Sequence, residues 1–207
     1  GYVGVELIRL LNAHPQVELS AIGSNSFVDK SITEVYPSVG IGNDMKCMKN
    51  EDVIKNSDLI FTALPHGVSE EFVLQAVKEG KKVVDLGADF RLKDEATFKE
   101  WYNVSFIDKK LHEEAVYGLC EHYKDEIKNA KVIANPGCYV TSISLPLMPL
   151  LKEKLIKAGL PVKEITELKE IAEKITGVPK KVELGNRVVA NVLYRDGTLL
   201  DTIKNTL

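Results

Sequence analysis

The chain has 207 residues, of which 44% are hydrophobic and 28% charged, and its formal net charge is -3. This balance is ordinary for a globular protein and gives no electrostatic reason to expect a nucleic acid or an anionic membrane as partner. The apolar runs are too short to span a membrane, and three widely spaced cysteines form no disulfide framework, so we expect a cytoplasmic protein.

A pair of glycines opens the chain and leads into a predicted helix. The first four residues are Gly1, Tyr2, Val3 and Gly4. The helix pattern ends at Pro15, and Val3, Leu7 and Leu10 share its apolar face, while the run over residues 17–23 predicts a buried strand. Glycines before a helix and strand are typical of a dinucleotide-binding unit, where they let a pyrophosphate approach the helix N-terminus. The strand that normally precedes the glycines is not in the sequence, so we expect a fold lacking its first strand.

Hydroxyl side chains follow the strand predicted over residues 17–23, where such units read the ribose of the cofactor. Ser24 and Ser26 flank Asn25, and no acidic residue is placed to bind a ribose 2′-hydroxyl. The hydroxyls suit a 2′-phosphate instead. The pattern therefore favours NADP over NAD.

Three further apolar runs predict strands, over residues 57–64, 82–86 and 131–134. A helix pattern begins at Ser69, between the first two of these strands, and short glycine-bearing turns connect the elements. Strand–helix–strand repeats favour a Rossmann-like α/β fold, in which a parallel sheet carries helices on both faces.

Chemically useful residues follow these strands. The strand over residues 57–64 ends in a turn formed by Leu64, Pro65, His66 and Gly67. The segment 85–91 ends the next strand, and Cys138 follows the last one. Because ligands of parallel α/β sheets bind at the carboxyl ends of the strands, the sequence predicts a site at this edge of the sheet.

Cys138 is the candidate nucleophile. Pro136 and Gly137 form a tight turn before it, and a predicted helix begins near Thr141. The unpaired N–H groups and positive dipole end of a helix start favour a thiolate, which is the reactive form of cysteine. The alternative is a buried cysteine that only fills space.

The other histidines and cysteines give no sign of a metal site. Cys47, Cys120 and four dispersed histidines show no pair with the spacing of metal ligands. His112 and His122 lie among charged residues, so we expect both in solvent, and we expect Trp101 to pack rather than to recognise a ligand.

Four motifs in chain order resemble those of the N-acetyl-gamma-glutamyl-phosphate reductase family, within the aspartate-semialdehyde dehydrogenase superfamily. They are Gly1-Tyr2-x-Gly4-x-Glu6-Leu7, Ala63-Leu64-Pro65-His66-Gly67, the run from Asp85 to Leu92, and Asn135-Pro136-Gly137-Cys138-Tyr139. The resemblance implies an NADP-binding domain over residues 1–158. The cofactor-binding residues it implies, together with the serines above, are Gly1, Tyr2, Val3, Gly4, Ser24, Ser26, Leu64, Pro65, His66 and Gly67.

The resemblance also implies a reaction of arginine biosynthesis. Cys138 would attack the acyl phosphate of N-acetyl-glutamyl phosphate and release phosphate, and the thioester would take a hydride from NADPH to give N-acetylglutamate semialdehyde. The family's acid/base histidine lies in a second domain, which does not follow residue 158. His66 could substitute for it, although we expect His66 to shape the loop near the cofactor. Family members usually self-associate through that second domain, so a homo-oligomer is a candidate state.

Residues 159–207 have a different character. A helix pattern ends at Gly177, and two apolar runs around Asp196-Gly197 predict a β-hairpin. The segment resembles the C-terminal end of the citrate lyase alpha subunit through Ala158-Gly159-Leu160-Pro161-Val162, Ile175-Thr176-Gly177-x-Pro179 and Tyr194-Arg195-Asp196-Gly197-Thr198. The alternative function is therefore a non-catalytic fusion fragment or a module associated with citrate lyase.

Overall fold

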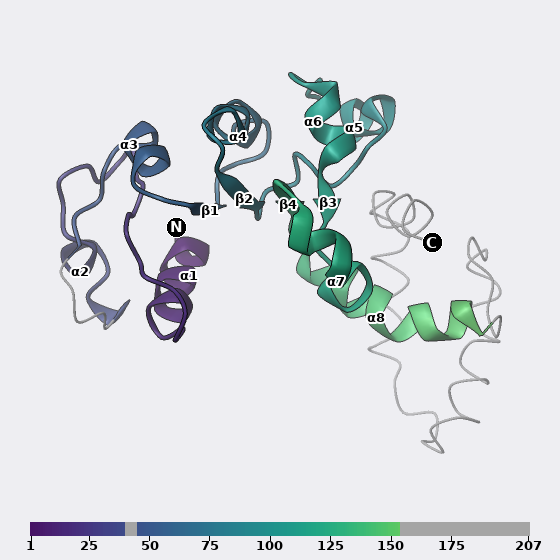
Figure 1. Ribbon diagram of the computed structural model, residues 1–207, viewed down its shortest axis with the longest axis horizontal. Coiled ribbons are helices and arrows are strands. Elements are labelled where there is room, and N and C mark those ends of the chain that lie inside the picture. Colours follow the sequence, from purple (N-terminus) through teal and green to yellow (C-terminus); the bar gives the residue numbers. More distant parts are fainter. Residues whose placement is uncertain (40–44, 154–207) are drawn as a thin grey trace, which may run out of the picture. The chain divides into compact units, whose positions relative to one another are not determined.

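The computed structural model describes residues 1–39 and 45–153 (Figure 1). The chain divides into two compact units, Gly1–Asn135 and Pro136–Leu207. The helices of the first unit are α1 (Tyr2–Asn12), α2 (Ile32–Val35), η1 (Pro37–Val39), α3 (Asn50–Lys55), α4 (Ser69–Lys78), α5 (Glu95–Tyr102), α6 (Lys109–Glu114) and α7 (Cys120–Asn129). The described part of the second unit contains α8 (Cys138–Lys152). The predicted domain boundary at residue 158 and the predicted helix and hairpin after it lie outside the described residues.

A four-stranded parallel sheet forms the centre of the first unit. Its strands are β1 (Leu59–Thr62), β2 (Lys82–Asp85), β3 (Val116–Tyr117) and β4 (Val132–Ala134). They pair in the order β1-β2-β4-β3, and every pair is parallel. In Figure 1, α4 and α7 lie on opposite sides of the row of strands. The Rossmann-like α/β architecture predicted from the strand–helix–strand repeats is confirmed.

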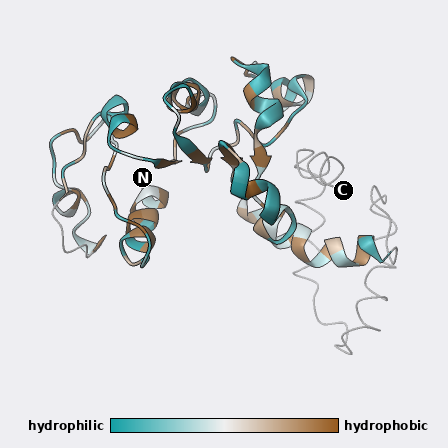
Figure 2. Ribbon diagram, viewed as in Figure 1, coloured by the Kyte–Doolittle hydropathy of each residue, from teal (hydrophilic) through white to brown (hydrophobic). Residues whose placement is uncertain are grey.

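The main hydrophobic core lies between the strands and the helices that follow them. Ile60, Val83 and Val132 occupy neighbouring strands and are buried, and they pack with Ile54 of α3 and Val73 of α4. Each such side chain stabilises the fold by roughly 1.5–3 kcal/mol relative to an exposed one. The strands are accordingly brown in Figure 2, whereas α7, which buries none of its residues, is largely teal.

A second hydrophobic cluster holds the N-terminal segment. It consists of the buried residues Ile8, Ile22, Ile32, Val39 and Cys47. The prediction of a strand over residues 17–23 is wrong. Within the described residues, this segment makes one isolated bridge, between Gly23 and Met48, and forms no strand. A strand needs a hydrogen-bonded neighbour along its length, and apolar composition alone does not supply one.

The face of α1 that the sequence predicts to be apolar and covered is only partly covered. Val3 is 54% exposed and Leu10 is 52% exposed, whereas Ile8 is the buried residue of the helix. The periodicity correctly indicates a helix but does not show which of its apolar residues find a partner.

Two further elements, over residues 116–117 and 120–129, are not predicted from the sequence. The two-residue strand β3 is followed by α7, and the Gly118 N–H donates to the Ala134 carbonyl oxygen at 2.8 Å. A Cβ at Gly118 would lie 2.9 Å from Ile133 Cγ2, so a side chain does not fit between the two strands. Trp101, which we expected to pack, is 41% exposed on α5.

No helix among residues 1–39 and 45–153 has both the length and the apolar character needed to cross a membrane.

Candidate active site

The turn after β1 contains the predicted cofactor-binding residues Leu64, Pro65, His66 and Gly67. Leu64 is half-buried, and the other three residues are exposed. Gly67 has a φ of 77°, in the left-handed region that side chains disfavour. A Cβ at this position would also lie 3.1 Å from Val104 Cγ2. Backbone conformation and close packing therefore both require glycine here.

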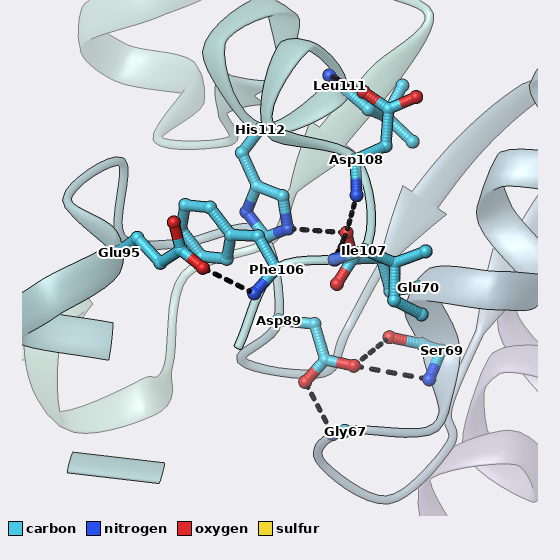
Figure 3. A network of polar contacts seen from close by, with 10 residues as sticks. All are labelled: Gly67, Ser69, Glu70, Asp89, Glu95, Phe106, Ile107, Asp108, Leu111 and His112. Atoms are coloured by element: carbon cyan, nitrogen blue, oxygen red, sulfur yellow. Dashed lines mark hydrogen bonds and ion pairs between the residues drawn. The ribbon is translucent and has the colours of Figure 1, made fainter. Parts of the chain in front are cut away.

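A buried carboxylate holds this turn against the segment that follows β2. Asp89 is 1% exposed, and its Oδ1 accepts a hydrogen bond from the Gly67 N–H at 2.8 Å (Figure 3). Its Oδ2 accepts from the N–H of Ser69 at 3.2 Å and from the Ser69 hydroxyl at 2.7 Å. Asp89 thus caps the start of α4 from a distant part of the sequence.

His66 is held by the same segment. The Ala88 N–H donates to His66 Nδ1 at 3.2 Å, and the His66 ring centroid lies 5.4 Å from that of Tyr102. The ring of His66 is thus held by the segment after β2, and the residue is exposed.

A second buried carboxylate ends β2. Asp85 is fully buried, and the Thr62 hydroxyl of β1 donates to its Oδ1 at 2.6 Å. Burial raises the pKa of Asp85, and the nearby negative charge of Asp89 also raises it, while the hydrogen bond from Thr62 partly opposes the shift. Asp85 and Asp89 place two carboxylates beneath the strand-end turns.

A buried contact between the Glu70 carboxylate and the His112 ring is the feature of this region that sequence reasoning missed. Both side chains are buried, and His112 Nε2 lies 3.0 Å from Glu70 Oε1 (Figure 3). The same oxygen accepts from the N–H groups of Ile107 and Asp108, each at 2.8 Å. Burial alone would raise the pKa of Glu70, but the interaction with His112 and the two N–H donors outweigh it, so the pKa is lowered.

The prediction that His112 is in solvent is wrong, whereas His122 is exposed as expected. The His112 ring stacks on Phe106 with centroids 3.5 Å apart and on Phe90 with centroids 4.8 Å apart. In the sequence, only the apolar neighbours Leu111 and Ala115 signal the buried side of α6. Glu70, its partner, is 42 positions away in numbering (112 minus 70), which no local pattern can reveal.

The predicted residues at the chain start and after residue 23 lie outside both hydrophobic clusters. Gly1 is the N-cap of α1 and Tyr2 is 89% exposed. A Cβ at Gly1 or at Gly4 would meet no atom of residues 1–39 or 45–153 within 4 Å, so these residues leave space beside both glycines. The Ser24 N–H donates to the Met48 carbonyl oxygen at 3.0 Å, and Ser26 is exposed. Ser24 thus contacts Met48, which packs against the main core, whereas the turn at residues 64–67 contacts Ala88, Asp89 and Val104.

The chain leaves the sheet at Asn135, whose backbone is fixed on both sides. Its N–H donates to the Asp85 carbonyl oxygen at 2.8 Å, and its own carbonyl oxygen accepts from Arg91 Nε at 2.9 Å. The next unit begins at Pro136, and Gly137 is the N-cap of α8. Cys138 is the first residue of this helix and is exposed. The structure confirms that the cysteine lies at a helix start.

The other two cysteines differ from Cys138 in their surroundings. Cys47 is buried, which raises the pKa of its thiol, and Cys120 is exposed with its Sγ donating to the Gly118 carbonyl oxygen at 3.6 Å. The described residues contain no group of three or more His, Cys, Asp or Glu side chains that could hold a metal ion.

Replacing Gly67 by alanine should destabilise the fold through the strand-end turn. The positive φ alone costs about 1–2 kcal/mol for a residue with a side chain, and the contact with Val104 adds to it. Gly80→Ala is the matched control, because Gly80 has a φ of 78° and no atom within 4 Å of its Cβ position. Urea unfolding should show a larger loss for Gly67→Ala than for Gly80→Ala; equal losses would contradict the packing role of Val104.

Comparisons with known proteins match the two parts of the chain to different families. Residues 1–130 match the family described as semialdehyde dehydrogenase, NAD binding domain. Residues 135–206 match the family described as citrate lyase, alpha subunit. The helix that begins at Cys138 therefore lies within the second match.

Among curated proteins, N-acetyl-gamma-glutamyl-phosphate reductases are similar to this chain. The protein from Clostridium kluyveri is 50% identical over 157 residues, which are 76% of this chain and 46% of that protein. The protein from Pelotomaculum thermopropionicum is 46% identical over 158 residues, covering 75% of this chain and 46% of its own length. The chain spans about half the length of the curated relatives it matches.

A solved structure with a similar fold is the aspartate semialdehyde dehydrogenase with NADP from Candida albicans. The TM-score is 0.52 at 18% sequence identity, and the match covers 77% of this chain and 45% of that one. At this identity the likeness supports the fold.

Proposed function

Because the chain belongs to the semialdehyde dehydrogenase family through its NAD-binding domain, we propose that it reduces an acyl phosphate with NADPH. The substrate is N-acetyl-glutamyl phosphate, the product is N-acetylglutamate semialdehyde, and the step belongs to arginine biosynthesis in the cytoplasm. The similarity to reductases of this name supports the substrate. The observation that carries the proposal is an exposed Cys138 at the first residue of a 15-residue helix.

Cys138 is the nucleophile in this proposal. Its thiolate attacks the acyl carbon, a sulfur–carbon bond forms, and the bond from that carbon to the phosphate oxygen breaks, which releases inorganic phosphate. The N–H groups at the start of α8 have no partner within the helix and can stabilise the developing negative charge. A thiolate suits both halves of the reaction, because it attacks well and later leaves the thioester.

The residues of the first unit fit a dinucleotide in three respects. The open space beside Gly1 and Gly4 would let phosphates approach the start of α1, which is 11 residues long. Ser24 and Ser26 would meet a ribose 2′-phosphate, which favours NADP over NAD. The turn Leu64-Pro65-His66-Gly67, together with Tyr2 and Val3, would contact the rest of the cofactor. When bound, NADPH supplies the hydride that reduces the thioester.

The proposal is tested by mixing the chain with N-acetyl-glutamyl phosphate and following NADPH absorbance and phosphate release in parallel. We expect phosphate release that saturates with substrate and NADPH consumption in equal amount. NADH in place of NADPH should support a lower rate at the same concentration, because it lacks the 2′-phosphate. NADPH consumption without phosphate release would contradict an acyl-phosphate substrate, and equal rates with both cofactors would contradict the role of Ser24 and Ser26.

The match of residues 135–206 to the citrate lyase alpha subunit supports a second candidate. In this candidate the chain is a non-catalytic module that associates with citrate lyase subunits. Copurification with those subunits, together with no NADPH binding by titration, would favour it. Sedimentation of the chain alone would show whether it forms a homo-oligomer.

A further inference from the structure

Ala88 and Asp89 each make a hydrogen bond to the exposed turn after β1. The Ala88 N–H binds the ring of His66, and the Asp89 carboxylate binds the N–H of Gly67. We propose that Asp89 is a positioning residue of the cofactor site, which holds the turn at residues 65–67 in the one shape that accepts the nicotinamide dinucleotide. This inference rests on the proposed function, since that function assigns the turn to the cofactor.

The chemistry of the three donors explains why the residue is a carboxylate. Asp89 Oδ1 faces the N–H of Gly67, and Oδ2 faces the N–H and the hydroxyl of Ser69. Both oxygens therefore accept hydrogen bonds, and an amide side chain would turn an NH₂ group toward at least one of these N–H donors. Because Asp89 is 1% exposed, water cannot easily replace the lost acceptor.

Apart from these two bonds, the Val68 N–H donates to the Pro65 carbonyl oxygen at 3.3 Å across the turn. Pro65, His66 and Gly67 are all exposed, and Gly67, which has a positive φ, lies close to Val104. Val104 lies a few residues before Ile107 and Asp108, whose N–H groups donate hydrogen bonds to Glu70. The Asp89 carboxylate thus joins the turn to the start of α4, and the next residue of that helix, Glu70, makes the other group of buried contacts in Figure 3.

The experiment compares two variants that both weaken the start of α4. Asp89→Asn removes the acceptor for either Gly67 or Ser69, whereas Ser69→Ala removes the hydroxyl and leaves both N–H bonds to Asp89. We expect Asp89→Asn to weaken NADPH binding about tenfold or more, the usual effect of losing a hydrogen bond to a charged group, and Ser69→Ala to change it less than about twofold. In turnover, the KM for NADPH should rise in Asp89→Asn while the KM for N-acetyl-glutamyl phosphate stays unchanged.

Asp94→Asn is the matched control. Asp94 accepts from the N–H and hydroxyl of Thr97 at the start of α5, the same pattern as Asp89 and Ser69, but it is exposed. The Asp94→Asn variant should bind NADPH with the same affinity as the unmodified chain. Equal losses of NADPH affinity in Asp89→Asn and Ser69→Ala would overturn the inference, because they would reduce Asp89 to a helix cap.

A measurement on the unmodified chain tests the inference even if the Asp89→Asn variant does not fold. Saturating NADPH should slow amide hydrogen exchange at Gly67 and Ala88, the two N–H groups that fix the turn. Unchanged exchange at both positions would overturn the inference while NADPH binding itself upholds the proposed function. A chain that binds no NADPH in the same titration would instead overturn the proposed function, and the inference with it.

Discussion

Cys138→Ser should abolish the reduction of N-acetyl-glutamyl phosphate, lowering kcat by roughly a thousandfold or more. A serine hydroxyl is not ionised at neutral pH and gives an ester, which transfers its acyl group less readily than a thioester. The variant should still bind NADPH, because Cys138 belongs to the unit that begins at Pro136 and the proposed cofactor residues belong to the other unit. The measurement is NADPH consumption together with phosphate release.

Cys120→Ser is the matched control for this substitution. Cys120 is also exposed, and its Sγ donates only a weak hydrogen bond to Gly118, so the variant should keep its rate within about twofold. Mass spectrometry without NADPH should detect an acyl group on the unmodified chain and none on Cys138→Ser. Retained turnover in Cys138→Ser would disprove the assignment of the nucleophile.

Glu70→Ala should be the most destabilising single substitution in the first unit, lowering the free energy of unfolding by about 3–5 kcal/mol. The change leaves a buried His112 without its partner and removes the acceptor of the N–H groups of Ile107 and Asp108. Glu71→Ala is the control on the same helix, and because Glu71 is exposed it should change stability by less than about 0.5 kcal/mol. Urea unfolding followed by Trp101 fluorescence measures both.

The stabilisation from Glu70 should depend on pH in a defined direction. Its pKa is lower in the folded chain than the ordinary value of 4.5, so the folded state binds this proton more weakly than the unfolded state does. The contribution is therefore complete above pH 4.5 and is lost as the pH falls below that value. The stability difference between the unmodified chain and Glu70→Gln should shrink over the same range, and a difference that grows on acidification would contradict the buried contact.

The sequence could predict the sheet and the turns because those features depend on local patterns. The apolar runs at residues 59–62, 82–85 and 132–134 form the predicted parallel strands, and their bounds are within a few residues of the prediction. Gly67 and the helix start at Cys138 follow from turn chemistry, in which glycine permits a positive φ and proline fixes φ at about -65°. These are the parts of the candidate site that sequence reasoning reached.

What the sequence could not predict depends on partners far away in the chain. Residues 17–23 have strand composition, but within the described residues they form only the bridge between Gly23 and Met48, and composition cannot indicate whether a neighbouring strand is present. His112 looks polar in the sequence, yet Glu70 and two phenylalanine rings make it a core residue. Asp89 resembles any loop aspartate until the fold brings the N–H groups of Gly67 and Ser69 to it.

The strand order gives the sheet two unequal margins. In the described part of the chain, β1 pairs with β2 alone, so the opposite row of its backbone N–H and C=O groups has no ladder partner. At the other margin, β3 has two residues, so few of its backbone groups are available for pairing with a further strand. The β1 sequence Leu-Ile-Phe-Thr carries no charge, and Leu59 is 46% exposed, so nothing on this margin repels an incoming strand. An uncharged, exposed edge strand of this kind is the type of edge on which another extended segment can pair through backbone hydrogen bonds.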